Sequence, residues 1–465
     1  MLPHNAKMLA VFREAGYAVS QRLEEGVLQV EFGIDPTERS LMVMADREQR
    51  AEARGMSALL APRSVVVVAE PGPGADLGLA AALARHLAAP ADGPVVHVVG
   101  IAEDVPGATA AALAALDQVD LVVLSVPAPR AAAVLRRCVR LRPRGVVVIS
   151  GGYAETGPRG LDLQRELLRV AHGGGMRVLG PASFGFWRGA PGTPTGNASL
   201  APVPPRPGAV ALFCQSAPLA VGLLASAERR NLGLSTFVSA GHRADVSGND
   251  VMQFLISDEH THVAGLYLES IGNPRKFARV ARRLARTTPV VVVTAGRSGH
   301  VVPAGHAVRR TLEPRRVLDE LLRQSGVIRA ETQHHMLDIA QLLASQPLPR
   351  GRRVAVLAGS GALAALTAEA AASAGLTVCV QRAILPGGGH TDTDLERLEA
   401  ELDEHARAGE LGASSSPLIG SAGPFEHHRE TSTGWGCYES STCNFTTWRC
   451  NYCGATSMTP NVRAE

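Results

Sequence analysis

The sequence predicts an α/β protein with tandem doubly wound parallel sheets, followed by an irregular C-terminal tail. Short runs of β-branched residues alternate with alanine-rich stretches of helical length, and such continuous apolar strands indicate sheets buried on both faces. The alternation breaks at a proline-rich linker, 200–208, and then starts again. With 465 residues, of which 46% are hydrophobic, the chain has room for about three domains.

The N-terminal part predicts too little structure for a domain of its own. Residues 5–33 have the pattern of a helix followed by a two-stranded hairpin. Residues 35–62 open with the triplet Asp-Pro-Thr, a typical helix start, and continue as a connecting helix rich in Arg, Glu and Ala.

Strands and helices alternate regularly from residue 64 onward. The strands of the first sheet are expected at 64–70, 95–100, 120–127, 145–150 and 176–180, and its helices at 77–88, 107–117, 128–140 and 161–173. The strands of the second sheet are expected at 209–214, 234–239, 265–270 and 289–295, and its helices at 218–229, 249–257, 274–286 and 335–344. A third α/β unit of strand, helix and strand, 350–381, then breaks off.

Charge and composition exclude several classes of partner. Lys+Arg 46 and Asp+Glu 43 leave a net charge of +3, which predicts neither a nucleic-acid nor a membrane-surface partner. No apolar run reaches the ~20 residues that span a bilayer, and the amphipathic start lacks the apolar core of a signal peptide. Cys138, Cys214 and Cys379 are scattered, as expected of buried thiols in a reducing compartment. A cytoplasmic protein is therefore expected.

A glycine-rich turn is the first candidate binding motif. Gly72, Gly74 and Gly78 lie between the first strand and its helix, where glycines let backbone N–H groups approach a phosphate. The spacing differs by one residue from G-x-G-x-x-G, so a turn without a ligand stays open as the alternative. No acidic residue after the second strand is placed to hold a ribose hydroxyl, which favours coenzyme A over a dinucleotide.

Two strand-to-helix turns carry the second candidate motif. Gln215 and Ser216 follow one buried strand, and Ser360 and Gly361 repeat the arrangement in the last α/β unit. Each serine could cap its helix while the first amides of the helix face an anion, and the two helix starts could converge on one phosphate. A plain N-cap is the alternative function of Ser216.

The third candidate is a glycine-rich loop, 296–308, that leaves a buried strand and carries His300 and His306. Such a position lies where α/β enzymes keep their ligands, and an imidazole there can act as base, nucleophile or metal ligand. Glu269, at the end of another strand, should lie at the rim of the sheet or have a partner, because a lone buried carboxylate is costly. A carboxylate that faces an imidazole fixes its tautomer.

Together these motifs resemble the nucleoside-diphosphate-forming acyl-CoA synthetases, relatives of the succinyl-CoA synthetase α subunit. The resemblance covers roughly residues 60–380. The motifs that carry it, in order, are VVISGGYAETG, GPASFGF, VALFCQSAPLAVGLLA, VSAGHRADVSGNDVMQFL, LYLESIGNPRKFARVARR, VVVVTAGRSG, GHAV and LRQSGVIR.

The resemblance implies a Rossmann-like coenzyme A-binding domain at 63–200 and a flavodoxin-like phosphohistidine domain at 207–346. It implies that His306 takes a phosphoryl group from an acyl phosphate, with Glu269 as its orienting carboxylate. The residues implied to hold coenzyme A are Gly72, Gly74, Gly78, Val126 and Pro127, and those implied to bind phosphate are Gln215, Ser216, Ser360 and Gly361. No metal ligand is expected.

Some residues depart from the family's pattern. Ala182 and Ser183 stand where Asn and Cys are usual, Ala217 replaces Gly, and Val308 replaces the Gly after GHA. No ATP-grasp domain is expected in this chain, so ATP or ADP and Mg would bind only to a missing domain or a separate β subunit. We therefore expect an acyl-CoA synthetase α-type protein, acting on acyl-CoA or acyl phosphate as part of an oligomer. The alternative is a catalytically inactive acyl-CoA-binding regulatory module.

The two ends of the chain lie outside this resemblance. Residues 1–34 resemble the end of a GNAT-type acetyltransferase, of a kind fused to such synthetases, and a chain truncated at both ends is expected. The tail, 382–465, begins with an acidic helix pattern and ends in a segment with Cys437, Cys443, Cys450 and Cys453. A zinc site, a thioether-bridged peptide precursor and a frame-shifted, disordered end are all open, and the disordered end is favoured.

Overall fold

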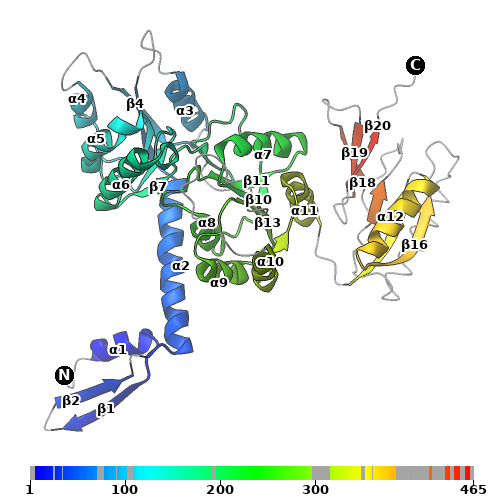
Figure 1. Ribbon diagram of the computed structural model, residues 1–465, viewed down its shortest axis with the longest axis horizontal. Helices are drawn as coiled ribbons and strands as arrows, with labels where there is room; N and C mark the ends of the chain where they lie inside the picture. The colour runs from blue at the N-terminus through cyan, green and yellow to red at the C-terminus, as the bar shows by residue number, and fades with distance from the viewer. Residues whose placement is uncertain are drawn as a thin grey trace. The chain divides into compact units, whose positions relative to one another are not determined.

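The computed structural model in Figure 1 divides into two compact units. The first comprises Met1–Gly222 and Leu234–Arg329, and the second comprises Leu223–Gly233 and Ala330–Glu465. The residues described are 6–24, 27–33, 35–70, 78–90, 92–101, 108–190, 195–295, 315–346, 351–358, 360–383, 400 and, as backbone only, 418–421, 435–439, 445–450 and 456–460.

The N-terminal helix, hairpin and connecting helix expected from the sequence are present. They are α1 (Ala6–Glu14), β1 (Val19–Glu24), β2 (Val27–Phe32) and α2 (Glu38–Leu60). The strands β1 and β2 are antiparallel. The ring of Phe32 packs on Phe12 and Tyr17, with centroids 4.5 and 5.4 Å apart. Thr37 begins α2 with a capping box, as the Asp-Pro-Thr start predicts.

The first sheet has five parallel strands in the order β4-β3-β5-β6-β7. Its strands are β3 (Ser64–Ala69), β4 (Val95–Gly100), β5 (Leu121–Ser125), β6 (Gly145–Val148) and β7 (Arg177–Leu179). The helices that alternate with them are α3 (Gly78–Ala88), α4 (Ala108–Ala114), α5 (Ala128–Cys138) and α6 (Pro158–Gly173). Each matches a predicted element, with the ends moved by at most a few residues.

The burial of β3 confirms that this sheet is covered on both faces. Val65, Val67 and Ala69 belong to one buried apolar cluster, and Val66 and Val68 belong to another, all at most 2% exposed. Alternate residues of a strand point to opposite faces of the sheet, so an unbroken valine run requires apolar cover on each side.

The second sheet has seven strands in the order β14-β13-β12-β10-β11-β8-β9. The five parallel strands are β10 (Pro207–Cys214), β11 (Leu234–Ser239), β12 (Val263–Leu268), β13 (Val290–Thr294) and β14 (Ile328–Arg329). The helices that follow β10, β11 and β12 are α7 (Ala217–Arg229), α8 (Gly248–Leu255) and α9 (Pro274–Leu284), and α10 (Arg315–Gln324) precedes β14.

Two short strands extend this sheet in a way that the sequence did not predict. The strand β8 (Gly185–Arg188) is antiparallel to β11, and β9 (Gly196–Asn197) is antiparallel to β8. Residues 185–197 were expected within the first domain, but they pair with the second sheet. Phe186 and Trp187 are at most 2% exposed, so pairing at this edge buries two large rings.

The second unit contains a small parallel sheet in the order β16-β15-β17. Its elements are α11 (Gln333–Ser345), β15 (Arg353–Ala358), α12 (Gly361–Ser373), β16 (Thr377–Ala383) and β17 (Leu418–Ser421). The strands β18 (Trp435–Glu439), β19 (Phe445–Cys450) and β20 (Thr456–Pro460) form an antiparallel sheet. The sequence did not predict these four tail strands, and disorder in the rest of the tail stays a prediction.

No helix within the described ranges is both long and apolar enough to cross a membrane.

Candidate functional site

Eight of the eleven predicted site residues lie in the described part of the chain. Gly72, Gly74 and His306 fall outside it, as does His300. Ser360 and Gly361 belong to the second unit and the others to the first, so the predicted convergence of two helix starts on one phosphate stays a prediction. Ser360 caps α12, accepting a hydrogen bond from Leu363 N at 3.2 Å.

Gln215 ties the end of β10 to the end of β12. Its side chain, 2% exposed, accepts hydrogen bonds at Oε1 from Glu269 N at 2.6 Å and Ser270 N at 2.9 Å. Its Nε2 donates to Ser270 O at 3.0 Å, and its own N–H donates to Tyr267 O at 3.2 Å. The amide oxygen of Gln215 and one N–H of its Nε2 thus hold residues 269–270, and we call this set of hydrogen bonds the Gln215 clamp.

The clamp places Glu269 beside the start of α7. Ser216 Oγ accepts a long hydrogen bond from Leu219 N at 3.5 Å, and Ser216 O accepts from Ala220 N at 2.9 Å, which is the geometry of an N-cap. Within the described residues, the N–H groups of Ser216 and Ala217 have no hydrogen-bond partner, and Pro218 has no N–H. Backbone donors at a helix start favour a bound anion.

Burial and the Glu269 carboxylate act together on two neighbouring groups. The pKa of the Cys214 thiol is raised to about 12, first by burial and then by the charge of Glu269. The pKa of Tyr267 is raised well above its ordinary value for the same two reasons. Cys214 Sγ donates to Ser216 O at 3.0 Å, so this thiol is a packed, unreactive group at neutral pH.

Arg243 adds a cationic group next to the clamp that the sequence did not single out. Its Nη1 donates to Ser270 O at 3.2 Å, and it lines a shallow pocket with Gln215, Ser247 and Phe277. Burial lowers the pKa of Arg243, although Asp250 opposes this. The sequence around Arg243 did not indicate this role, because arginine is the common cationic residue throughout the chain.

The three predicted coenzyme A residues that the structure describes lie at the point where the strand order of the first sheet reverses. The strand β3 has β4 on one side and β5 on the other, and ligands of α/β proteins bind beyond the carboxyl ends of strands at such a point. Val126, fully buried, follows β5 directly, and the exposed Pro127 stands at the N-cap position of α5. Gly78 begins α3, the helix after β3.

The loop 180–184 joins the carboxyl ends of the two sheets. Ser183 N donates to Val148 O at 3.1 Å, and Ser183 Oγ donates to Ser239 O at 2.6 Å. On the other side of this loop, His242 N donates to Pro181 O at 2.9 Å. Gly241 has φ +51°, and a Cβ there would lie 2.2 Å from Pro181 O, so a glycine is needed for this close approach.

An ion pair spans the same junction. Glu155 lies in the short helix η3 (Ala154–Thr156) after β6, and its Oε2 is 3.0 Å from Nδ1 of His242, which follows β11. The two side chains are only 14% and 18% exposed. Burial alone would raise the pKa of Glu155, but hydrogen bonds from its own turn, including Gly152 N, and the charge of His242 lower it overall.

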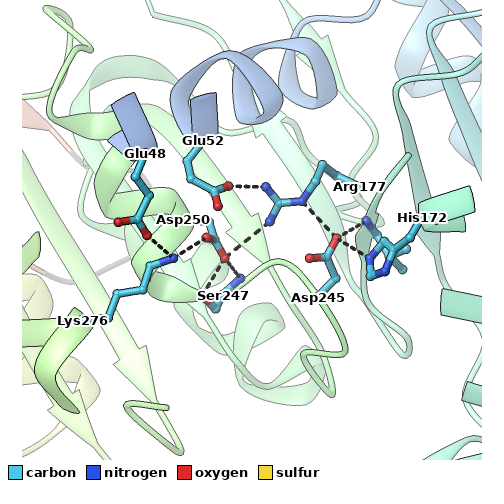
Figure 2. Close-up of polar contacts among 9 residues, drawn as sticks. Glu48, Glu52, His172, Arg177, Asp245, Ser247, Asp250 and Lys276 are labelled. Atoms are coloured by element: carbon cyan, nitrogen blue, oxygen red, sulfur yellow. Dashed lines mark hydrogen bonds and ion pairs between the residues drawn. The ribbon is translucent and has the colours of Figure 1, made fainter. Parts of the chain in front are cut away.

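Arg177 forms the centre of a second cluster between the sheets, drawn in Figure 2. From β7, its guanidinium contacts Glu52 of α2, Asp245 at 3.0 Å and Asp250 of α8 at 3.6 Å. Asp245 also accepts from Val178 N at 2.8 Å. Burial alone would lower the pKa of Arg177, but these three carboxylates raise it well above its ordinary value.

The same cluster anchors α2 to α8 and α9. Lys276 Nζ lies 3.0 Å from Glu48 and 3.8 Å from Asp250, and Gln49 Nε2 donates to Gln253 O at 3.0 Å. Figure 2 shows Glu48 and Glu52 pointing from α2 toward Lys276 and Arg177. The sequence gave only a weak signal for these contacts, because Glu48 and Glu52 look like ordinary surface residues of an arginine-rich helix.

Two segments of the chain match known domain families. Residues 78–187 match the CoA binding domain, and residues 207–343 match the succinyl-CoA ligase like flavodoxin domain. This confirms the two α/β domain types that the sequence predicts. The resemblance of residues 1–34 to an acetyltransferase stays a prediction.

Curated relatives align with more than half of the chain. The α subunit of ADP-forming acetate–CoA ligase I from Pyrococcus furiosus is 33% identical over 262 residues, which is 56% of this chain and 56% of the relative. The ADP-forming 4-hydroxybutyrate–CoA ligase of Nitrosopumilus maritimus is 27% identical over 320 residues, 64% of this chain and 46% of the relative. The chain thus spans about half the length of the curated relatives it matches.

Solved structures share the fold. The apo form of dinucleotide forming acetyl-coenzyme A synthetase 1 from Ca. Korarchaeum cryptofilum matches with a TM-score of 0.61 and 27% identity, covering 70% of each chain. The same enzyme in complex with phosphate and ADP matches with a TM-score of 0.59 and 27% identity, covering 70% of this chain and 69% of the other.

Proposed function

We propose that this chain, with its CoA binding domain and its succinyl-CoA ligase like flavodoxin domain, is the α-type part of an ADP-forming acyl-CoA synthetase. The first domain would bind coenzyme A or an acyl-CoA, and the second would carry the phosphoryl group on His306. The relatives that match both domains are named as ligases that join acids to CoA. A cytoplasmic location is part of this proposal, and so is the domain division 1–34, 35–62, 63–200, 207–346 and 350–381, except that residues 185–197 pair with the second sheet.

The Gln215 clamp is the observation that supports the second half of this proposal. It holds the backbone of Glu269 against the turn that starts α7. The residue with the carboxylate, Glu269, and the backbone N–H groups of Ser216 and Ala217 therefore lie at the same edge of the second sheet. Amides stabilise the oxygens of a phosphoryl group, and a carboxylate orients an imidazole. A phosphohistidine needs both kinds of group.

The chemistry follows from these roles. The neutral imidazole of His306 attacks the phosphorus of an acyl phosphate, the bond between phosphorus and the acyl oxygen breaks, and the acid leaves as its carboxylate. Glu269 would stabilise the imidazole in its attacking tautomer. The amides of Ser216 and Ala217 would bind the transferred phosphoryl oxygens. The phosphoryl group then passes to ADP on an ATP-grasp partner, which we propose as a β subunit in an oligomer that also supplies the Mg site.

Labelling with acetyl [³²P]phosphate tests the phosphoryl step. The wild-type chain should give an acid-labile, base-stable phosphoprotein, His306→Ala should abolish it, and Glu269→Gln should slow it at least about tenfold. His300→Ala, in the same loop, is the matched control and should keep most of the label. Full labelling of His306→Ala would exclude His306 as the carrier.

A catalytically inactive acyl-CoA-binding module is the outcome if labelling fails while coenzyme A still binds. Calorimetry with coenzyme A on the same preparation separates the two functions. If coenzyme A at millimolar concentration does not bind, both proposed functions are contradicted.

A further inference from the structure

A half-buried ion pair lies at the point where the first sheet reverses its strand order. Glu70 follows β3, and its N–H donates to Ser125 O of β5 at 3.3 Å. Arg130, in the first turn of α5, donates from Nη1 to Glu70 Oε1 at 2.9 Å. The other carboxylate oxygen of Glu70, Oε2, is buried and accepts no hydrogen bond within the described residues. A carboxylate therefore lies at the edge where a phosphate ligand is expected.

The start of α5 is poor in backbone donors. Pro127 at the N-cap and Pro129 have no N–H, so Ala128 contributes the one amide of residues 127–129, and Arg130 N donates to Pro127 O at 3.0 Å. No side chain caps this helix. An anion at this helix start would find few amides, and the guanidinium of Arg130 is the group that supplies further donors and a positive charge.

The ion pair contributes little to the stability of the fold. The side chains of Arg130 and Glu70 are 43% and 27% exposed, and ion pairs with this exposure contribute little to the free energy of unfolding. Arg130 can therefore exchange one anionic partner for another at low cost. A phosphate offers more acceptor oxygens than the one oxygen of Glu70 to which Arg130 donates, and a guanidinium matches it in a bidentate way.

We propose that Arg130 is a phosphate-contacting residue of the coenzyme A site and that Glu70 holds it in place until the ligand arrives. On binding, Arg130 leaves Glu70 for a phosphate oxygen of coenzyme A, either in the diphosphate or at the 3′ position. This inference rests on the proposed function, because it takes coenzyme A as the ligand of this domain. Glu70 competes with the ligand for Arg130 and repels its negative charge.

Calorimetry on the full chain with coenzyme A, dephospho-coenzyme A and pantetheine tests this exchange. Arg130→Gln should raise the Kd for coenzyme A about tenfold or more, the loss typical of a charged hydrogen bond. Glu70→Gln should lower that Kd about threefold, because it frees Arg130 and removes a repulsive charge. Neither variant should change the weak binding of pantetheine, which has no phosphate.

Arg136→Gln is the matched control. Arg136 lies in the same helix and pairs with Glu166, so its loss removes the same charge from α5 away from the strand ends. An equal loss with dephospho-coenzyme A assigns the contact to the diphosphate, and a loss seen only with coenzyme A assigns it to the 3′-phosphate.

Three results separate failure of this inference from failure of the proposed function. Unchanged coenzyme A binding in Arg130→Gln would exclude the contact. Weaker binding in Glu70→Gln would exclude the competition, since it would mean that Glu70 itself contacts the ligand or must hold Arg130. If coenzyme A does not bind to the wild type, the proposed function itself is contradicted.

Discussion

At the scale of single residues, Gln215 shows how one side chain can fix a site without touching a ligand. Its amide oxygen and one of its two side-chain N–H groups bind the backbone of residues 269–270. The sequence predicted Gln215 as a phosphate-binding residue, and that direct role stays a prediction. The described contacts give it a positioning role instead.

Replacing Gln215 by Ala should destabilise the chain by about 2–3 kcal/mol, because the N–H groups of Glu269 and Ser270 lose a buried acceptor. Urea denaturation measures the change. Gln324→Ala is the control, since the exposed side chain of Gln324 donates to Glu320 at 2.7 Å, and it should cost less than about 0.5 kcal/mol. Equal stability of the two variants would mean that the clamp does not matter.

Glu155 should make stability depend on pH in a defined direction. Its pKa is lowered in the folded chain, so it contributes stability above its ordinary pKa of 4.5 and loses it as the pH falls through the folded value. Glu155→Gln should therefore be less stable than the wild type from pH 8 to pH 5, by about 1 kcal/mol.

The difference between Glu155→Gln and the wild type should shrink below pH 4.5, and urea denaturation at each pH measures it. Glu166→Gln, which removes the partner of Arg136 at the surface, should show little difference at any pH. A gap that widens on acidification would contradict the sign of the shift.

At the scale of elements, α2 is held by contacts with three other segments. Arg177 of β7, Lys276 of α9 and the carbonyl of Gln253 of α8 all contact it. The connecting helix is therefore a packed part of the first unit. The residues that contact α2 belong to the Arg177 cluster, which also joins β7 to the start of α8.

Replacing Arg177 by Met should destabilise the first unit by about 2–4 kcal/mol, because Asp245, Asp250 and Glu52 would keep their charges without the shared cation. Hydrogen exchange should then show faster exchange in α2 and in the first turn of α8. Arg165→Met, which breaks an exposed pair with Asp162, is the control and should leave both helices protected. Unchanged α2 protection in Arg177→Met would contradict this role.

The pattern of strands could be predicted because each strand is local in sequence. The valine runs that became β3 and β13 are unbroken and bounded by turn residues, so their ends were predicted to within a residue. The strand β8 was missed because its four residues follow no alternation and its partner, β11, lies about fifty residues further along. The tail strands were missed because the segment lacks a clear apolar period.

The candidate site was predicted less completely than the fold. Motif residues such as Ser216 and Glu269 could be found because they follow buried strands directly. Arg130, Arg243 and the pair of Glu155 with His242 could not, because each depends on contacts between segments far apart in the sequence. Because the sequence is rich in arginine, nothing distinguished Arg130 and Arg243 from the other arginines.

At the scale of the whole molecule, the proposed function needs two domains to act on one substrate. The loop 180–184 and the ion pair of Glu155 with His242 join the carboxyl ends of the two sheets, which are the edges where each domain would bind its ligand. Acyl-CoA bound to the first domain would react with phosphate near the second. Neither domain alone could complete that step.

One measurement tests both domains at once. The chain is incubated with [³²P]phosphate and either acetyl-CoA or 4-hydroxybutyryl-CoA, which carry the acyl groups of the named relatives. Our account predicts that at least one thioester releases free coenzyme A and labels His306 with an acid-labile, base-stable phosphate, and that no label forms without the thioester. Thioesters that bind to the chain yet release no coenzyme A and leave no label would contradict it.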